Sequence, residues 1–216
     1  MISYFVTAIG TEIGKTYVSA RLLEGWRGEG LKVHAVKPVM SGFGENELDR
    51  SDAGELLKGC GLDVSPEAVS GICLHRFEAP LAPNVAMRQS GVEQDYKNIL
   101  AFTRKHIASP GTDRLLVEGA GGVMSPLTDD ALQIDFAADL GLPVILVAAP
   151  YLGAVSHTLS AIDALQARGL TIDRLIISQP DPESPLPQSL AEEVLKFRTL
   201  PIELLDNKGS EFETHR

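Results

Sequence analysis

Five short apolar runs recur along the chain, and segments with the apolar spacing of helices lie between them. This alternation is typical of βαβ units, in which crossover helices join parallel strands. The runs are apolar almost throughout, as in strands buried on both faces of a sheet. The sequence therefore predicts an α/β fold: a mostly parallel central sheet with helices on both faces. The predicted strands are residues 4–8, 32–39, 114–118, 143–149 and 174–178, and the predicted helices are residues 14–29, 93–107, 135–140, 155–168 and 189–197.

The length of 216 residues fits one domain with a substantial core. We therefore expect a single domain spanning residues 1–216. The proline-rich segment 180–187 is expected to be a surface loop, and the polar tail 207–216 is expected to fray. The first predicted helix illustrates the buried-face pattern, because its apolar residues recur at three- and four-residue spacings. These residues are Val18, Leu22, Leu23 and Trp26.

Composition argues against several classes of partner. Nineteen basic and 29 acidic residues give a formal net charge of −10, which disfavours nucleic acid as the main ligand. The N-terminus lacks the pattern of a signal peptide, and the longest apolar stretch, residues 143–150, is too short to span a bilayer. A cytoplasmic protein without membrane contact is expected. The only cysteines, Cys60 and Cys73, suit neither a disulfide framework nor a zinc site and are expected to be ordinary thiols.

A candidate phosphate loop connects the first predicted strand to the first predicted helix. It ends in Gly14, Lys15 and Thr16. In a phosphate loop such a glycine lets the backbone approach phosphate, the lysine reaches the β- and γ-phosphates, and the hydroxyl ligates magnesium. The strict spacing fails, because Ile9 stands where that pattern has its first glycine. Such a tripeptide can also simply begin a helix, but the strand–loop–helix context favours phosphate binding.

A second candidate site follows the predicted strand 114–118. That strand ends in Glu118, and three glycines follow within four residues. Glycine is unfavourable for stability unless the backbone needs its freedom, so this run suggests more than a fold requirement. We interpret Glu118 as a magnesium ligand and the loop Gly119–Ala120–Gly121 as backbone that contacts phosphate or substrate.

Two further polar groups lie near predicted strand or helix ends. Lys37 lies near the end of the second predicted strand; lysine is usually a solvated charge there, but Pro38 and the turn at Ser41 would hold it near the phosphate loop. Asp52 follows Ser51 in a segment typical of a helix N-cap. Carboxyl ends of parallel strands meet at one edge of a sheet, where ligands bind. The pattern therefore predicts an enzyme site at that edge.

Four segments together resemble the dethiobiotin synthetase family. The matching motifs are Thr-Glu-x-Gly-Lys-Thr at residues 11–16, Lys-Pro-Val-x-Ser-Gly at 37–42, Ser-Asp-Ala at 51–53 and Val-Glu-Gly-Ala-Gly-Gly at 117–122. The chain departs from the family at Ala8, where the first loop glycine is usual, and at residues 80–84. It also has Ser178 and Gln179 where a base-binding Asn-Asp is frequent.

This resemblance implies a P-loop NTPase-like fold and an ATP- and Mg²⁺-dependent cyclo-ligase. Such enzymes convert 7,8-diaminopelargonate and carbon dioxide to dethiobiotin through a carbamate and a carbamic–phosphoric anhydride, releasing ADP and phosphate. They are homodimers. The resemblance implies Lys37 and Lys15 as catalytic groups, Thr16, Asp52 and Glu118 as metal ligands, and Thr11, Lys37 and Ser41 as substrate contacts. It implies nucleotide contacts at Glu12, Ile13, Gly14, Lys15, Thr16, Asp52, Glu118, Gly119, Ala120, Gly121, Ser178 and Gln179.

Two other classes of protein share parts of this pattern. Partitioning or division-type P-loop ATPases act as switches, but they carry a second lysine early in the loop, where this chain has Ala8, Ile9 and Gly10. Cobyrinate-type amide synthetases usually continue into a glutaminase domain with a cysteine nucleophile, and neither cysteine here lies in a nucleophile elbow. The ligase is the first interpretation, with these two as alternatives.

Overall fold

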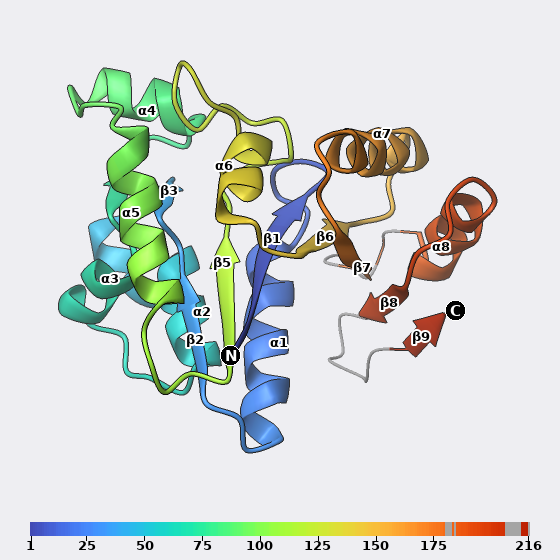
Figure 1. Ribbon diagram of the computed structural model, residues 1–216, viewed down its shortest axis with the longest axis horizontal. Coiled ribbons are helices and arrows are strands. Elements are labelled where there is room, and N and C mark those ends of the chain that lie inside the picture. The colour runs from blue at the N-terminus through green and yellow to red at the C-terminus, as the bar shows by residue number, and fades with distance from the viewer. Residues whose placement is uncertain (180–182, 184, 206–212, 216) are drawn as a thin grey trace.

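The computed structural model describes residues 1–179, 183, 185–205 and 213–215, and its central feature is a seven-stranded sheet in the order β2-β5-β1-β6-β7-β8-β9 (Figure 1). The neighbouring strands pair in parallel except β8 and β9, which are antiparallel. The predicted α/β class with a mostly parallel sheet is confirmed. The strands are β1 (Ile2–Ala8), β2 (Val33–Val36), β5 (Arg114–Glu118), β6 (Val144–Ala148), β7 (Ile172–Ser178), β8 (Ile202–Leu205) and β9 (Glu213–His215).

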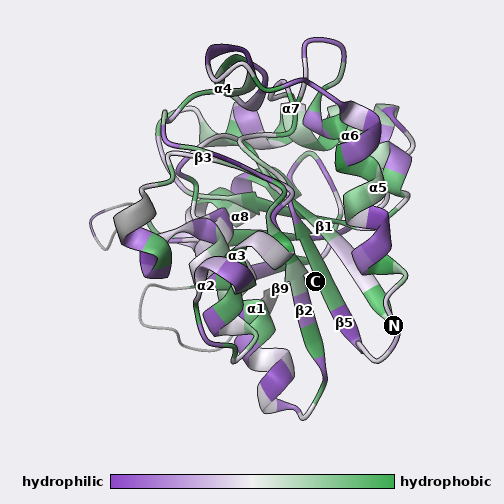
Figure 2. Ribbon diagram, turned by 90° about the vertical axis from the view of Figure 1, so that its left-hand side faces the viewer, coloured by the Kyte–Doolittle hydropathy of each residue, from purple (hydrophilic) through white to green (hydrophobic). Residues whose placement is uncertain are grey.

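Both faces of the sheet are covered by helices, and each face has its own apolar core. Along β1, Phe5 packs into one core while Tyr4 and Val6 pack into the other, as the two-residue period of a strand requires. The first core lies under α4 (Pro83–Gln89), α5 (Tyr96–Ile107), α6 (Gln133–Leu140), α7 (Ala154–Ala167) and α8 (Pro187–Leu195). The second lies under α1 (Lys15–Gly28), α2 (Asp52–Gly59) and α3 (Pro66–Ile72). Figure 2 shows the hydrophobic strands inside and hydrophilic residues on the outer helices.

The apolar face predicted for the first helix is the buried face of α1. Val18, Leu22 and Leu23 are buried. Trp26 is only partly buried and stacks on Tyr4, with the ring centroids 5.7 Å apart. The helix thus packs its predicted stripe against β1 and its neighbours.

The predicted strand 32–39 is wrong in its second half. β2 ends at Val36, and a separate strand β3 (Val39–Ser41) pairs in parallel with β4 (His75–Phe77) in a small two-stranded sheet. The chain leaves the main sheet because Pro38 has no N–H with which to continue a strand. The amide of Lys37 instead donates to the carbonyl of Ile72 at 2.9 Å. Lys37, at the point of this departure, is buried.

Two segments expected to be irregular lie partly outside the described residues. Of the predicted loop 180–187, residues 180–182 and 184 are outside, and Pro187 begins α8. Of the predicted frayed tail 207–216, residues 207–212 and 216 are outside. Residues 213–215 form β9, which pairs with β8.

Both cysteines are free thiols, Cys73 buried and Cys60 partly buried. Burial raises the pKa of each thiol to about 12. Within the described part of the chain, no helix is both long and apolar enough to cross a membrane.

Candidate active site

The loop between β1 and α1 forms one end of the main cavity. β1 ends at Ala8 and α1 begins at Lys15, so the loop lies at the carboxyl edge of the sheet. Gly14 has φ of 87° and no side chain caps the helix it precedes, and Glu12 has φ of 59°, which is unusual for a residue with a side chain. The first backbone amides of α1 therefore have no side-chain cap, and this end of the helix lines the cavity. The helix dipole favours an anion at this position.

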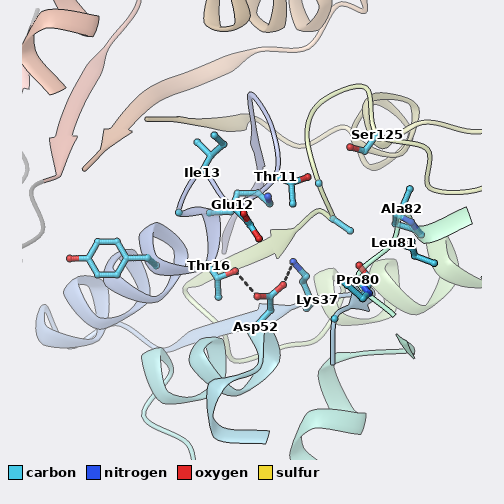
Figure 3. A pocket seen from close by; sticks show the side chains of 18 residues that line it. Thr11, Glu12, Ile13, Thr16, Lys37, Asp52, Pro80, Leu81, Ala82 and Ser125 are labelled. Atoms are coloured by element: carbon cyan, nitrogen blue, oxygen red, sulfur yellow. Dashed lines mark hydrogen bonds and ion pairs between the residues drawn. The ribbon is translucent and has the colours of Figure 1, made fainter. Parts of the chain in front are cut away.

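A cavity of about 710 Å³ brings together most of the sequence-predicted site residues (Figure 3). Its lining includes the predicted residues Thr11, Glu12, Ile13, Gly14, Lys15, Thr16, Lys37, Ser41, Asp52, Ala120 and Gly121. Figure 3 shows the phosphate-loop residues on one side of this cavity and Pro80, Leu81, Ala82 and Ser125 on the other. Lys37 and Asp52 lie between the two ends. The cavity thus has a phosphate end and a second end, with charged groups between them.

Four side chains form a tight polar cluster at the base of the cavity. The Lys37 ammonium lies 2.6 Å from Glu118 Oε1 and 2.8 Å from Asp52 Oδ2. The hydroxyl of Thr16 donates to either carboxylate, at 2.9 Å from Glu118 Oε1 and 3.1 Å from Asp52 Oδ1. Lys37 also donates to the carbonyl of Gly119 at 3.1 Å. The end of the phosphate loop, the segment after β2, α2 and β5 therefore each contribute one group to a single charged centre.

Burial makes this cluster electrostatically strong. Lys37 is 2% exposed and Glu118 is fully buried. Burial by itself lowers the pKa of Lys37, but attraction to Asp52 and Glu118 outweighs it and the net effect raises that pKa above its ordinary value. Burial also disfavours the charged form of Asp52 and by itself raises its pKa, but Lys37 and the Thr16 hydroxyl outweigh this and lower the pKa overall. Lys37 is thus held as a cation and Asp52 as an anion.

Lys15 lies in a different electrostatic environment. Burial, and then repulsion from Lys37, lower its pKa to about 8, against the partial compensation of Glu118 and Asp52. Its side chain lines the cavity beside the phosphate loop. An anion bound there would restore a favourable partner for this partly desolvated ammonium group.

The oxygen atoms of Thr16, Asp52 and Glu118 suit a magnesium ion. Mg²⁺ prefers oxygen ligands and commonly binds one or two carboxylates together with substrate phosphates. The second carboxylate oxygen of Glu118, Oε2, is buried and has no hydrogen-bond partner among the described residues. A buried anionic oxygen without a partner is costly unless something binds it. The residues present therefore fit the cation that the sequence predicts.

The glycines after β5 have a packing role that sequence reasoning missed. A Cβ on Gly122 would approach the Ala8 carbonyl oxygen to 3.2 Å, and one on Gly119 would approach Phe5 Cζ to 2.9 Å. Gly121 has φ of 76°. These positions let the loop after Glu118 pack directly against β1 and the start of the phosphate loop, so the glycine run serves the fold as well as the site.

Some predicted nucleotide contacts lie outside the cavity lining. Glu118 and Gly119 are not among the lining residues, but Glu118 accepts hydrogen bonds from two residues that are, Lys37 and Thr16. Ser178 and Gln179 do not line the cavity either. Ser178 is buried, and its hydroxyl donates to the carbonyl of Ile13 at 3.1 Å. Ser178 thus supports the phosphate loop from behind.

Sequence reasoning missed the residues at the second end of the cavity. Ser125 lines it and accepts a hydrogen bond from the amide of Gly122 at 2.8 Å. Residues 80–83 form the facing wall, and Pro83 begins α4. The available signals were slight: a serine just after the glycine run, and a proline-rich segment that departs from the family motif.

Comparison with solved structures defines the class of fold. The MinC:MinD cell division protein complex of Aquifex aeolicus matches with a TM-score of 0.57 at 12% identity, covering 95% of this chain and 81% of that chain. The signal recognition particle receptor FtsY of Elizabethkingia anophelis, in complex with GDP, matches with a TM-score of 0.52 at 12% identity, covering 100% and 60%. With the loop between β1 and α1, these likenesses define a P-loop NTPase-like fold.

Sequence comparison identifies the family within that class. A family model described as an AAA domain matches residues 3–204. The ATP-dependent dethiobiotin synthetase BioD of Phenylobacterium zucineum is 45% identical over 86% of this chain and 80% of its own length. That of Methylobacterium nodulans is 38% identical over 91% and 89%. The chain belongs to the dethiobiotin synthetase family, as its motifs predicted.

Proposed function

We propose that the chain catalyses the ATP- and Mg²⁺-dependent carboxylation and ring closure of 7,8-diaminopelargonate with carbon dioxide, giving dethiobiotin, ADP and phosphate. Membership of the family supports the reaction. One observation supports placing the reaction in this cavity. The buried ammonium group of Lys37, paired with Glu118 and Asp52, lies between the two ends of the cavity. A fixed cation there would face both a transferred phosphoryl group and a carboxylated amine.

In the proposed reaction, one amine of the substrate captures carbon dioxide and becomes a carbamate. A carbamate oxygen then attacks the γ-phosphorus, the bond to the β-phosphate oxygen breaks, and ADP leaves. The second amine attacks the carbonyl carbon of the resulting anhydride and expels phosphate as the ring closes. Negative charge is thus present on the carbamate and on the phosphates throughout. Positioning and charge neutralisation are the main tasks of the protein in such transfers.

The proposed roles of the side chains follow from their places around the cavity. Lys15 and the amides at the start of α1 would bind the β- and γ-phosphates. Lys37 would stabilise the carbamate and its phosphorylated form, since a preorganised cation in a site of low water content stabilises developing charge strongly. Thr16, Asp52 and Glu118 would hold Mg²⁺. When bound, that ion would neutralise phosphate charge and orient the γ-phosphate.

The second end of the cavity would hold the diamine. A cavity of about 710 Å³ lies within the usual range for small-molecule sites and has room for more than the phosphates. Thr11 would lie at the junction of nucleotide and substrate, and Ser41 would offer the diamine a hydroxyl partner. Leu81 and the neighbouring prolines would contact its apolar chain. Contacts of Ser178 and Gln179 with the base, a homodimer and a cytoplasmic location belong to this proposal through the family resemblance.

The proposal is tested by measuring phosphate release from ATP and Mg²⁺, with and without the diamine and bicarbonate, and by identifying the product by mass. Release that needs both co-substrates and yields dethiobiotin supports it. Lys15→Ala serves as the inactive control, because it removes the phosphate-binding ammonium group. Hydrolysis that proceeds equally without the diamine would contradict the proposal and favour a switch-type ATPase.

A further inference from the structure

The carboxylate of Asp129 gathers several hydrogen bonds from one neighbouring segment. Asn84 Nδ2 donates to it at 2.8 Å, Arg88 Nη1 lies 3.1 Å from both of its oxygens, and Gln94 Nε2 donates at 3.1 Å. In return, the backbone amide of Asp129 donates to Gln94 Oε1 at 2.6 Å. Gln94 Nε2 also reaches the carbonyl of Asn84 at 3.3 Å. We call these four residues the Asp129 clasp.

The clasp joins the two walls of the cavity's second end. Asp129 belongs to the loop between β5 and α6, which contributes Ala120, Gly121 and Ser125 to the lining. Its partners lie on α4 and just after it, and α4 directly follows the facing wall, residues 80–83. Asn84 and Arg88 are four residues apart, so they project from the same face of that helix.

The loop that carries Asp129 is itself well held. The amides of Leu127 and Thr128 both donate to the carbonyl of Ala131, at 2.9 and 3.0 Å, which makes residues 127–131 a tight turn. Below the turn, Pro126 and Leu132 form a β-bridge. Asp129 is therefore presented from a fixed base rather than from a free loop.

The fold of α4 has a separate source of stability. Ala86 and Met87 are buried in the first core, between the sheet and α4–α8, so α4 should stay packed on the domain without the clasp. Exposed ion pairs usually contribute little to the free energy of folding, and the side chains of Asp129 and Arg88 are both exposed to solvent. Several converging hydrogen bonds can instead fix an orientation. Here they would fix the orientation of the start of α4, and with it residues 80–83, relative to Ser125.

We propose that Asp129 is a positioning residue that sets the separation of the walls formed by residues 80–83 and by Ser125, and thereby the binding of the substrate at that end. The inference rests on the proposed function for the identity of that substrate, the diamine. Small displacements of groups that position a substrate are known to have large kinetic effects. The phosphate end is built mainly from the loop between β1 and α1 and from the start of α1, and none of the clasp's hydrogen bonds reaches these segments, so nucleotide binding should not depend on the clasp.

The kinetic test compares Asp129→Ala with the wild-type enzyme. We expect the KM for the diamine to rise about tenfold, with kcat reduced less than about threefold and the KM for ATP unchanged. Asp129→Asn, which keeps the size and one acceptor oxygen, should recover part of the loss. Asp163→Ala is the matched control: it breaks a comparable exposed pair with Arg198, between α7 and the residues after α8, and should change none of these constants.

A second measurement does not depend on the reaction. Hydrogen exchange of the wild type and of Asp129→Ala, both without ligands, should show faster exchange in residues 80–94 and no change in residues 9–16. Unchanged exchange in 80–94, or an unchanged KM for the diamine in an active enzyme, would overturn the positioning role. So would a loss of kcat that merely follows a lowered Tm. A wild type that forms no dethiobiotin would instead contradict the proposed function, and the exchange result would still decide for or against the clasp.

Discussion

Replacing Lys37 with alanine should both inactivate and destabilise the protein. Lys37 is the only ammonium group that contacts Glu118 and Asp52 among the ion pairs of the described residues. Its removal leaves the fully buried Glu118 without its cation, and Oε2 of that carboxylate already has no partner. Lys15 interacts with both carboxylates at longer range, and it is itself partly desolvated. A net negative charge would therefore remain in the core.

The magnitude follows from the burial of the pair. Removing one partner of a buried ion pair costs about 3–5 kcal/mol, mostly from the uncompensated charge. The lower end applies here, because the side chain of Asp52 is 41% exposed and can be solvated. In a domain of this size, 1 kcal/mol shifts the Tm by about 2–4 °C. Lys37→Ala should thus lower the Tm by roughly 6–12 °C.

The assay is thermal unfolding with EDTA and with saturating Mg²⁺. Because a divalent cation could replace the lost charge between Asp52 and Glu118, Mg²⁺ should stabilise Lys37→Ala more than it stabilises the wild type. The double variant Lys37→Met/Glu118→Gln removes both charges and should recover most of the stability but no activity. Lys196→Ala, which breaks an exposed pair with Glu193, is the control and should change the Tm by little. A Tm of Lys37→Ala equal to that of the control would refute the reasoning.

Three further perturbations test other parts of the structure. Glu118→Gln should raise the Mg²⁺ concentration needed for half-maximal activity by at least about tenfold, measured by titration, since it removes an anionic ligand. Ser178→Ala should weaken ATP binding about three- to tenfold in calorimetry, because the carbonyl of Ile13 loses its buried donor. Burial, and then His106, lower the pKa of His34 to about 4. The unfolded chain therefore takes up this proton first, and stability should fall as the pH drops from about 6.5 to 4. The loss should be at most about 2.5 kcal/mol, and smaller because the ring is partly exposed to solvent, and it should be absent in urea unfolding of His34→Gln.

The parts of the fold that could be predicted are those with long, uniform patterns. β5 and β6 are buried along almost their whole length, as their continuous apolar runs between turn residues indicate. The strands that were missed, β4, β8 and β9, have three, four and three residues, too few to show a period. The break between β2 and β3 depends on Pro38 and on the partner strand β4, which is a tertiary contact that local pattern does not record.

The site was predictable as a set of residues but not as a geometry. Lys37 and Glu118 are 81 positions apart in the chain, and they meet because β2 pairs with β5 in a register that sets Val36 beside Val117. The motifs predicted that both residues lie at strand ends. They do not give the order of the strands in the sheet, so they could not predict that the two side chains meet. Ser125 and residues 80–83 carry no distinctive chemistry, so only their shared cavity reveals them.

The same strand register also determines which parts of the site are rigid. The amides of Gly119 and Val123 donate to the carbonyls of Val6 and Ala8, each at 3.0 Å, so the loop after Glu118 is joined by backbone hydrogen bonds to the strand that leads into the phosphate loop. These backbone hydrogen bonds involve no side chain, and the spacing of Glu118 from Thr16 is therefore preorganised before any ligand binds. Asp52 differs, because it begins α2, outside the sheet, and is partly exposed. Adjustment on binding of nucleotide and metal is therefore expected at Asp52 and α2, with Glu118 and the phosphate loop as the fixed frame.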